Sequence, residues 1–399
     1  MGRKQSAIFS DNRLKLGLFS LNCSGGMSVT MAPERWVNRR LRALGGVWAL
    51  LALAAGAVAA PAAPPAPREG DFTIQDFRFA SGETLPALRL HYRTLGTPRR
   101  DAAGHVINAV LILHGTDSSG GAFLQPTFGG ELFGAGQLLD NGRYFLILPD
   151  DIGHGRSSKP SDGLHARFPH YDYADMVEAE HRLVTEGLGV DRLRLILGAS
   201  MGGMHAFLWG EMWPDKIDAL MPMACAPVSI VGRNRLFRLM IVDAVKSDPA
   251  WQGGNYTEQP RQALRTIADL LALALGSPQQ MQKELPTPAA VDRYFEDLQH
   301  NSSGIDANDI LYAVSASDDY DPSAGLERIT APVMWVNSAD DFINPPELDI
   351  AETQVKRLKN GRFVLLPLGP NTHGHGTYKW AIAWKSYLGE LLKRSDGQR

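Results

Sequence analysis

Five short apolar runs in this 399-residue chain have the pattern of strands that are buried on both faces of a sheet. Helix-like stretches lie between them, including Tyr173 to Leu188 and Met201 to Met212. This alternation predicts an α/β fold with a mostly parallel central sheet flanked by helices, and functional groups at the carboxyl ends of its strands. The runs are Val110 to Leu113, Tyr144 to Leu148, Leu193 to Leu197, Val333 to Val336 and Phe363 to Leu366.

Two earlier runs have a different pattern. Thr73 to Phe79 and Leu88 to Thr94 alternate between apolar and polar residues, and Ser81-Gly82 lies between them as a turn. Alternation of this kind is typical of strands with one solvated face. We therefore expect an antiparallel hairpin at an edge of the sheet.

The strand pattern disappears between about Val228 and Arg328. We predict a helical lid at 229–328, inserted between two parts of the core at 68–228 and 329–399. Helical decoration with no role at the site is the alternative that the pattern leaves open. The helix-like stretches are Leu236 to Lys246, Pro260 to Leu275, Ala289 to Gln299 and Asp309 to Ala316.

Residues 1–67 have the composition of an N-terminal extension, a signal peptide and a Pro/Ala linker. Basic residues at 35–42 precede an apolar run from Ala43 to Ala60, which ends in the small residues Ala57-Val58-Ala59. This order is typical of a signal peptide, so we expect cleavage near Ala60 and a secreted or periplasmic protein without stable membrane insertion. A membrane anchor is the alternative, because the run is nearly long enough to span a bilayer.

Composition excludes several other classes of protein. Hydrophobic residues make up 44% of the chain and charged residues 21%, as in soluble globular proteins. A formal net charge of -3 provides no basic surface for nucleic acid. The two cysteines, Cys23 and Cys225, support neither a disulfide framework nor a zinc site. We expect no metal and no organic cofactor.

The candidate nucleophile is Ser200, in Gly198-Ala199-Ser200-Met201-Gly202. This segment fits the G-x-S-x-G pattern, follows a predicted strand and opens a predicted helix, which is the context that a nucleophile elbow requires. Because the turn is so tight, side chains at either glycine would collide with neighbouring backbone. An ordinary glycine-rich turn is the structural alternative.

The candidate acid lies after the fourth run, where Asp340 and Asp341 are adjacent. In this fold the acid and then the base follow the serine along the chain. We prefer Asp341, because its spacing to Pro345 fits the pattern D-x-(apolar)-x-P and that of Asp340 does not. Its task is to fix the tautomer of the base and to stabilise the imidazolium.

The candidate base lies after the fifth run, in Thr372-His373-Gly374-His375-Gly376. A serine hydroxyl is a poor nucleophile until a base removes its proton. We prefer His375 to His373, because glycines on both sides allow the loop to bring the ring to Ser200.

Acyl transfer also requires donors for the developing oxyanion. The backbone N–H of Met201 is one candidate. The backbone N–H of Thr116, in the loop after the first run, is the other, and His114 in that loop is interpreted as structural.

Several segments resemble the α/β-hydrolase superfamily: His114-Gly115, residues 149–158 and the Ser200 elbow. Gly198 to Met204, Asp175-Met176-Val177 and Asp319-Tyr320-Asp321-Pro322 are similar to its homoserine O-acetyltransferase-like branch. The resemblance implies an α/β-hydrolase fold with a helical lid, and places the family's nucleophile, acid and base on Ser200, Asp341 and His375.

The chain also departs from that branch. Gly376 follows the base where the acetyltransferases have an acid, His205 stands where they have Gln, and the loop from His114 to Asp117 differs. We therefore expect a serine hydrolase that cleaves a small-molecule ester, or a related acyl substrate, through an acyl-enzyme on Ser200. An O-acyltransferase that uses the same triad is the alternative.

Overall fold

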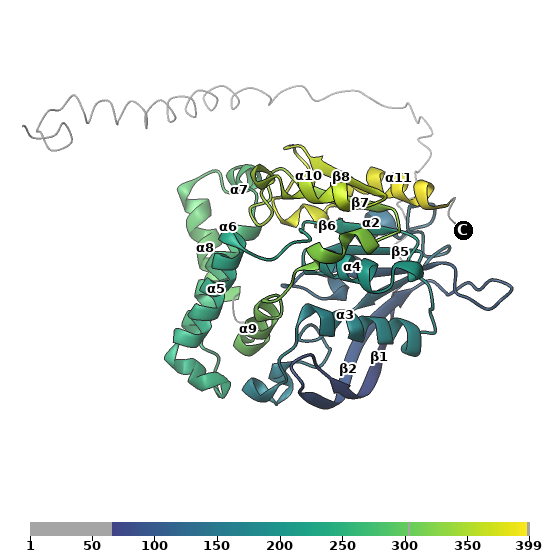
Figure 1. The fold of residues 1–399 in the computed structure, drawn as a ribbon. Helices are drawn as coiled ribbons and strands as arrows, with labels where there is room; N and C mark the ends of the chain where they lie inside the picture. The colour runs from purple at the N-terminus through teal and green to yellow at the C-terminus, as the bar shows by residue number, and fades with distance from the viewer. Residues whose placement is uncertain (1–65, 302–303, 397–399) are drawn as a thin grey trace, which may run out of the picture. The chain divides into compact units, whose positions relative to one another are not determined.

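The computed structural model describes residues 66–301 and 304–396 (Figure 1). Their centre is a single eight-stranded sheet with the order β1-β2-β4-β3-β5-β6-β7-β8. The strands are β1 (Arg68–Arg78), β2 (Thr84–Leu95), β3 (Ala109–Leu113), β4 (Phe145–Pro149), β5 (Leu195–Ala199), β6 (Leu220–Met223), β7 (Val333–Ser338) and β8 (Gly361–Leu366). The predicted α/β architecture is confirmed.

The predicted edge hairpin is present. β1 pairs antiparallel with β2 and forms one edge of the sheet, with Ile74 opposite Leu88. β2 also runs antiparallel to β4, whereas the pairings from β4 through to β8 are all parallel. The sheet is therefore mostly parallel, with the hairpin as its antiparallel end.

β6 is absent from the strands that the sequence predicted. This strand lies between β5 and β7 and is fully buried, and its Pro222 stands opposite Gly198. Proline within an apolar run normally argues against a central strand, because it removes a ladder hydrogen bond. Only the neighbours on both sides, which are distant in sequence, identify these four residues as a strand.

Helices cover both faces of the sheet, because alternate side chains of each buried strand point to opposite sides. On β3, Leu111 and Leu113 belong to one hydrophobic cluster, and Val110 and Ile112 belong to another. The first cluster includes residues of α3 (Tyr173–Arg182), α4 (Met201–Met212) and α10 (Ile350–Gln354). The second includes residues of α2 (Gly129–Leu132) and α11 (Lys385–Ser395).

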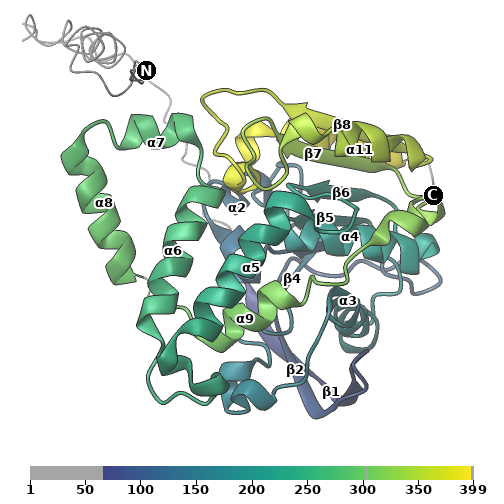
Figure 2. The same cartoon turned by 60° about the vertical axis from the view of Figure 1, so that its left-hand side comes forward.

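Among the described residues, five α-helices are inserted between β6 and β7, and Figure 2 shows most of them grouped on one side of the sheet. They have a small core of their own, which includes Ile241, Ile267 and Leu311. The four helix-like stretches of the sequence correspond to the first, second, fourth and fifth of these helices. They are α5 (Gly232–Ser247), α6 (Arg261–Leu275), α7 (Pro278–Glu284), α8 (Pro288–Asn301) and α9 (Ala307–Ser315).

The expected signal peptide, most of the Pro/Ala linker and Cys23 lie outside the described residues. Within the described residues, no helix is long and apolar enough to cross a bilayer. Cys225 is a buried free thiol next to the end of β6.

Candidate active site

Ser200 occupies a sharp turn between β5, which ends at Ala199, and α4, which begins at Met201. Its backbone has φ 54° and ψ -115°, a conformation that a non-glycine residue rarely adopts. A Cβ on Gly202 would lie 2.3 Å from the carbonyl oxygen of Leu113, and one on Gly198 would lie 2.0 Å from the carbonyl oxygen of Gly202. Both glycines are therefore sterically required, and the turn holds the serine above the end of the strand.

The structure brings Ser200, His375 and Asp341 into one line of hydrogen bonds. His375 Nε2 lies 2.8 Å from Ser200 Oγ, and its Nδ1 lies 3.0 Å from each carboxylate oxygen of Asp341. The three residues follow the carboxyl ends of β5, β8 and β7, which meet at one edge of a parallel sheet. The arrangement has the geometry of a nucleophile, a base and an orienting acid.

Asp341 is suited to remain a carboxylate although it is buried. Burial by itself would raise its pKa, but the charge of His375 and hydrogen bonds from His375 and Asn344 hold the pKa below its ordinary value. The backbone N–H groups of Ile343 and Asn344 donate to Oδ1 at 2.8 and 3.1 Å. The turn 341–344 thus fixes the carboxylate in place.

The two alternative residues do not reach Ser200 Oγ. Asp340 accepts hydrogen bonds from the Ser338 hydroxyl and from the backbone N–H of Gly374, at 2.9 Å for the latter. His373 stacks on Trp380 with ring centroids 4.0 Å apart. Both side chains hold the base loop in place without joining the hydrogen-bonded line.

The two predicted oxyanion donors lie beside the nucleophile. Met201 is the first residue of α4, and Thr116 lines the same pocket as Ser200 and His375. In the described part of the chain, neither backbone N–H has a hydrogen-bond acceptor, and the buried Thr116 hydroxyl is unpaired as well. These donors are free for the oxygen of a bound acyl group.

His114 holds the loop 114–117 in place through buried hydrogen bonds. It is fully buried, its Nδ1 lies 2.8 Å from the Gly115 carbonyl oxygen, and its Nε2 accepts the N–H of Asp151. Burial lowers its pKa to about 3, so the ring is neutral at ordinary pH. A structural role fits these contacts.

The catalytic pocket has a volume of about 40 Å³ and contains Ser200 and His375. Its other walls come mainly from the helical insertion, which therefore covers the site. From the sequence, Phe237 could be interpreted either as a pocket residue or as part of the core of the insertion. The other wall residues could not be predicted, because nothing local indicates which helix face meets Ser200. The wall residues include Phe237, Arg238, Ile241, Leu271, Leu275, Ile310 and Val314.

Arg238 is unusual in this wall, because a guanidinium is rarely buried without a carboxylate partner. It is 7% exposed, its Nε donates to Asn234 Oδ1 at 3.1 Å, and its other contact is a long one to the Val314 carbonyl oxygen. No ion pair joins it to a carboxylate among the residues that the structure describes. A positive charge therefore faces the catalytic pocket.

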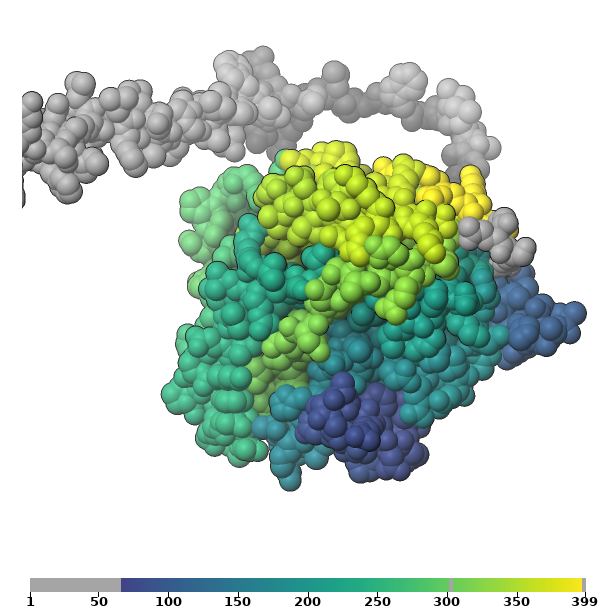
Figure 3. All heavy atoms as spheres, in the orientation of Figure 1, coloured from purple at the N-terminus to yellow at the C-terminus, as the bar shows by residue number. Residues whose placement is uncertain are grey.

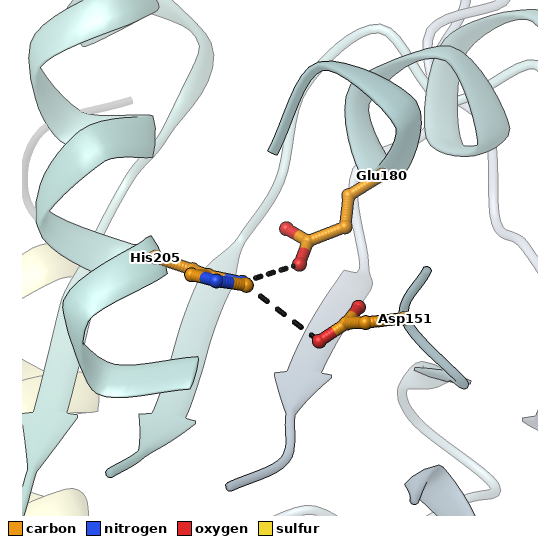
Figure 4. Close-up of side chains that lie close together, drawn as sticks. All are labelled: Asp151, Glu180 and His205. Carbon is orange, nitrogen blue, oxygen red and sulfur yellow. Dashed lines mark hydrogen bonds and ion pairs between the residues drawn. The ribbon is translucent and has the colours of Figure 1, made fainter. Parts of the chain in front are cut away.

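Asp151, Glu180 and His205 form a second group of buried titratable side chains (Figure 4). His205 on α4 has Nδ1 2.8 Å from Glu180 Oε1 on α3 and 3.8 Å from Asp151 Oδ2 after β4. Trp209 also donates to Glu180, at 2.6 Å. Burial raises the pKa of Asp151 well above its ordinary range and that of Glu180 to about 7, and it lowers that of His205 to about 4.

Carboxylate oxygens and an imidazole nitrogen can bind a metal ion, and those of Asp151, Glu180 and His205 lie within 4.8 Å of one another. Among the described residues, this is the group that could hold a metal ion. However, a histidine bound to a metal usually donates its second ring nitrogen to an acceptor, and Nε2 of His205 has no partner. Its Nδ1 is already hydrogen-bonded to Glu180. Hydrogen bonds from His205 and Trp209 to Glu180 join α3 and α4, and the buried Asp151 carboxylate lies beside them without a hydrogen-bond partner among the described residues.

Residues 108–367 match the family model for the alpha/beta hydrolase fold. The chain belongs to this family of enzymes, as the sheet order and the Ser200 turn also indicate. A homoserine O-acetyltransferase of Pelobacter propionicus is 30% identical over 357 residues, which cover 78% of this chain and 92% of that protein. Within the family, the chain lies in the homoserine O-acetyltransferase-like branch.

Solved structures show the same fold. An acetylester hydrolase from Corynebacterium glutamicum aligns with a TM-score of 0.71 and 22% identity, over 82% of this chain and 96% of that one. A homoserine O-acetyltransferase from Bacillus anthracis aligns with a TM-score of 0.69 and 20% identity, over 82% and 97%. The chain therefore shares its fold with proteins titled as a hydrolase and as an acyltransferase.

Proposed function

We propose that the chain is a serine ester hydrolase, with Ser200 as nucleophile, His375 as base and Asp341 as the acid that orients the base. The hydrogen-bonded line from Ser200 Oγ through His375 to Asp341 is the observation that carries this proposal. His375 Nε2 lies 2.8 Å from Ser200 Oγ, so it is positioned to take the proton of the serine hydroxyl as that hydroxyl attacks the substrate.

The proposed reaction has two steps, acylation of Ser200 and hydrolysis of the acyl-enzyme. In the first, Ser200 Oγ bonds to the ester carbonyl carbon, His375 Nε2 takes the hydroxyl proton, and the alcohol leaves with that proton as the ester C–O bond breaks. In the second, water attacks the acyl-enzyme, His375 removes its proton, and the acid is released as Ser200 regains the hydrogen. The N–H groups of Met201 and Thr116 are proposed to stabilise the oxyanion in both steps.

Acyl transfer to a hydroxyl acceptor is the second candidate, and Arg238 is the observation that favours it. A buried guanidinium without a carboxylate partner suits an acceptor that carries a carboxylate, as homoserine does. A relative named as a homoserine O-acetyltransferase supports the same candidate. Gly376 and the 114–117 loop, where the sequence departs from that branch, favour hydrolysis. The third departure, His205, is buried against Glu180 outside the catalytic pocket and favours neither candidate.

One experiment separates the two candidates. Purified protein receives p-nitrophenyl acetate together with homoserine or with 3-amino-1-propanol, which is homoserine without its carboxylate, and the products are identified by mass spectrometry. A hydrolase releases free acetate with either additive. A transferase yields O-acetylhomoserine in excess over the acetylated amino alcohol, and Arg238→Met removes that preference.

Two variants control the experiment. Ser200→Ala is expected to abolish turnover with an unchanged melting temperature, because it removes only the hydroxyl. Ser81→Ala, in the exposed turn of the edge hairpin, is expected to retain full activity. Substantial turnover by the folded Ser200→Ala protein would refute the assignment of the nucleophile.

We also propose that the protein is exported and that its signal peptide is cleaved near Ala60. The order of basic, apolar and small residues at 35–60 supports this proposal. N-terminal sequencing of protein recovered outside the cytoplasm tests it. A mature protein that begins near Ala60 is the expected result, and a retained apolar run would favour the membrane anchor.

A further inference from the structure

A larger cavity of about 480 Å³ adjoins the catalytic pocket. Asn234 and Ile343 line both spaces, so the two spaces are adjacent. The cavity lies where the loop after β7 meets the start of the helical insertion, and Figure 3 shows these segments, yellow-green and teal, side by side on one face. Its volume is within the range of small-molecule sites, roughly 300–1,000 Å³.

The inner wall of this cavity is apolar. Met204 and Trp335 are fully buried, and Phe363 and Leu365 project from the same side of β8. Three charged side chains also line the cavity: Arg233 and Glu347 are exposed, and Glu352 is half-buried. The fully buried part of the wall carries no charged side chain, so it favours an apolar occupant.

The polar groups of the inner wall already have partners. Asn337 Nδ2 donates to the Cys225 carbonyl oxygen, and its Oδ1 accepts from Trp335 Nε1. Asn344 Nδ2 donates to Asp341 and to the Ala224 carbonyl oxygen. A polar ligand would have to displace these bonds, whereas an apolar one leaves them intact.

We propose that this cavity binds the apolar alcohol portion of the ester, while the compartment of about 40 Å³ beside Ser200 holds an acyl group of acetyl size. The inference rests on the proposed ester hydrolysis and names its substrate class: acetates of hydrophobic alcohols. The space beside Ser200 is the smaller of the two, so it takes the shorter part of the ester, which is the acyl group that bonds to Ser200. The fold is shared with an acetylester hydrolase, which is consistent with a short acyl group.

Two ester series test which side of the substrate enters the cavity. The first is ethyl, butyl and hexyl acetate, and the second is ethyl acetate, butyrate and hexanoate, with released acid titrated at constant pH. We expect kcat/KM to rise at least tenfold from ethyl to hexyl acetate, within the limit of about fourfold per buried methylene. Along the acyl series it should fall. A flat alcohol series overturns the proposal, and a rising acyl series reverses the assignment.

A blocking variant tests the cavity itself. Leu365→Trp fills the space from β8, and we expect it to lower the ratio of kcat/KM for hexyl over ethyl acetate at least fivefold. Ile350→Trp fills it from α10 and replaces the first variant if that one does not fold. Leu368→Trp is the matched control, because Leu368 is 54% exposed and does not line the cavity. An unchanged ratio in the folded blocking variant contradicts the proposal.

Binding without turnover separates a failure of this inference from a failure of the proposed function. A ligand that binds only the folded state raises the melting temperature as its concentration exceeds Kd. We expect 1-hexanol to raise the melting temperature of Ser200→Ala but not of the same protein with Leu365→Trp added. If no ester is hydrolysed and this shift is present, the cavity assignment stands and the reaction is wrong. If esters are hydrolysed and the shift is absent, the cavity assignment is wrong.

Discussion

Replacing Asp341 with Asn tests the acid with the smallest change in shape. Two backbone N–H groups donate to Oδ1, so the carbonyl oxygen of the new amide would remain there. Its NH₂ group would then occupy the Oδ2 position, 3.0 Å from His375 Nδ1. A donor at that point requires an unprotonated Nδ1, which leaves the proton on Nε2. In this tautomer the ring cannot accept the proton of Ser200.

The expected loss of activity follows from that tautomer. The equivalent change in a Ser-His-Asp triad lowers kcat by about 10⁴-fold, which corresponds to about 5 kcal/mol of transition-state stabilisation. We expect a loss of this size for Asp341→Asn with p-nitrophenyl acetate at pH 7.5, with little change in melting temperature. The matched variant is Asp340→Asn, which changes the adjacent acid and should lose less than about tenfold. If Asp340→Asn is the more damaging of the two, the assignment of the acid is wrong.

Three further predictions concern the fold. Gly202→Ala should lower the melting temperature sharply, because its Cβ would lie 2.3 Å from the Leu113 carbonyl oxygen, whereas Gly130→Ala, whose nearest neighbour is at 3.7 Å, should be tolerated. Burial raises the pKa of Glu211 from 4.5 to about 7, so the folded state binds the proton of this carboxyl more tightly than the unfolded state does. The contribution of Glu211 to stability therefore falls as the pH rises between these two values. The melting temperature of Glu211→Gln should accordingly fall less than that of wild type between pH 5 and 8. Asp306→Ala removes the N-cap of α9, and urea titration should show a loss of about 1–2 kcal/mol in unfolding free energy.

The strands of the sheet and the position of each candidate site residue could be predicted because each depends on a local pattern. A buried strand followed by a glycine-rich turn identifies the position of Ser200 without knowledge of the rest of the chain. The preference for Asp341 over Asp340 rests in the same way on the spacing to Pro345. Each of these predictions uses residues within about ten positions of one another.

The features that were missed depend on residues far apart in sequence. β6 is a strand because β5 and β7 flank it, although Pro222 argues against it locally. Arg238 lies in the catalytic pocket because α5 is held by contacts with α6 and α9, which no pattern within α5 indicates. The buried side chains of Asp151, Glu180 and His205 come together from three separate segments, and no one of these segments has a pattern that predicts the group.

The base loop is held by the helical insertion as well as by the sheet. Gln280 on α7 donates to the carbonyl oxygens of Pro370 and Thr372, and Gly374 lies so close to the α6–α7 turn that a Cβ on it would be 2.5 Å from the Gly276 carbonyl oxygen. Moving the insertion outward would therefore pull on the loop that carries His375. The positions of the insertion and of His375 are therefore coupled: a displacement of α7 would also displace the ring whose Nε2 lies 2.8 Å from Ser200 Oγ. For the same reason, the insertion cannot be exchanged between relatives as an independent module unless the loop 370–377 is transplanted with it.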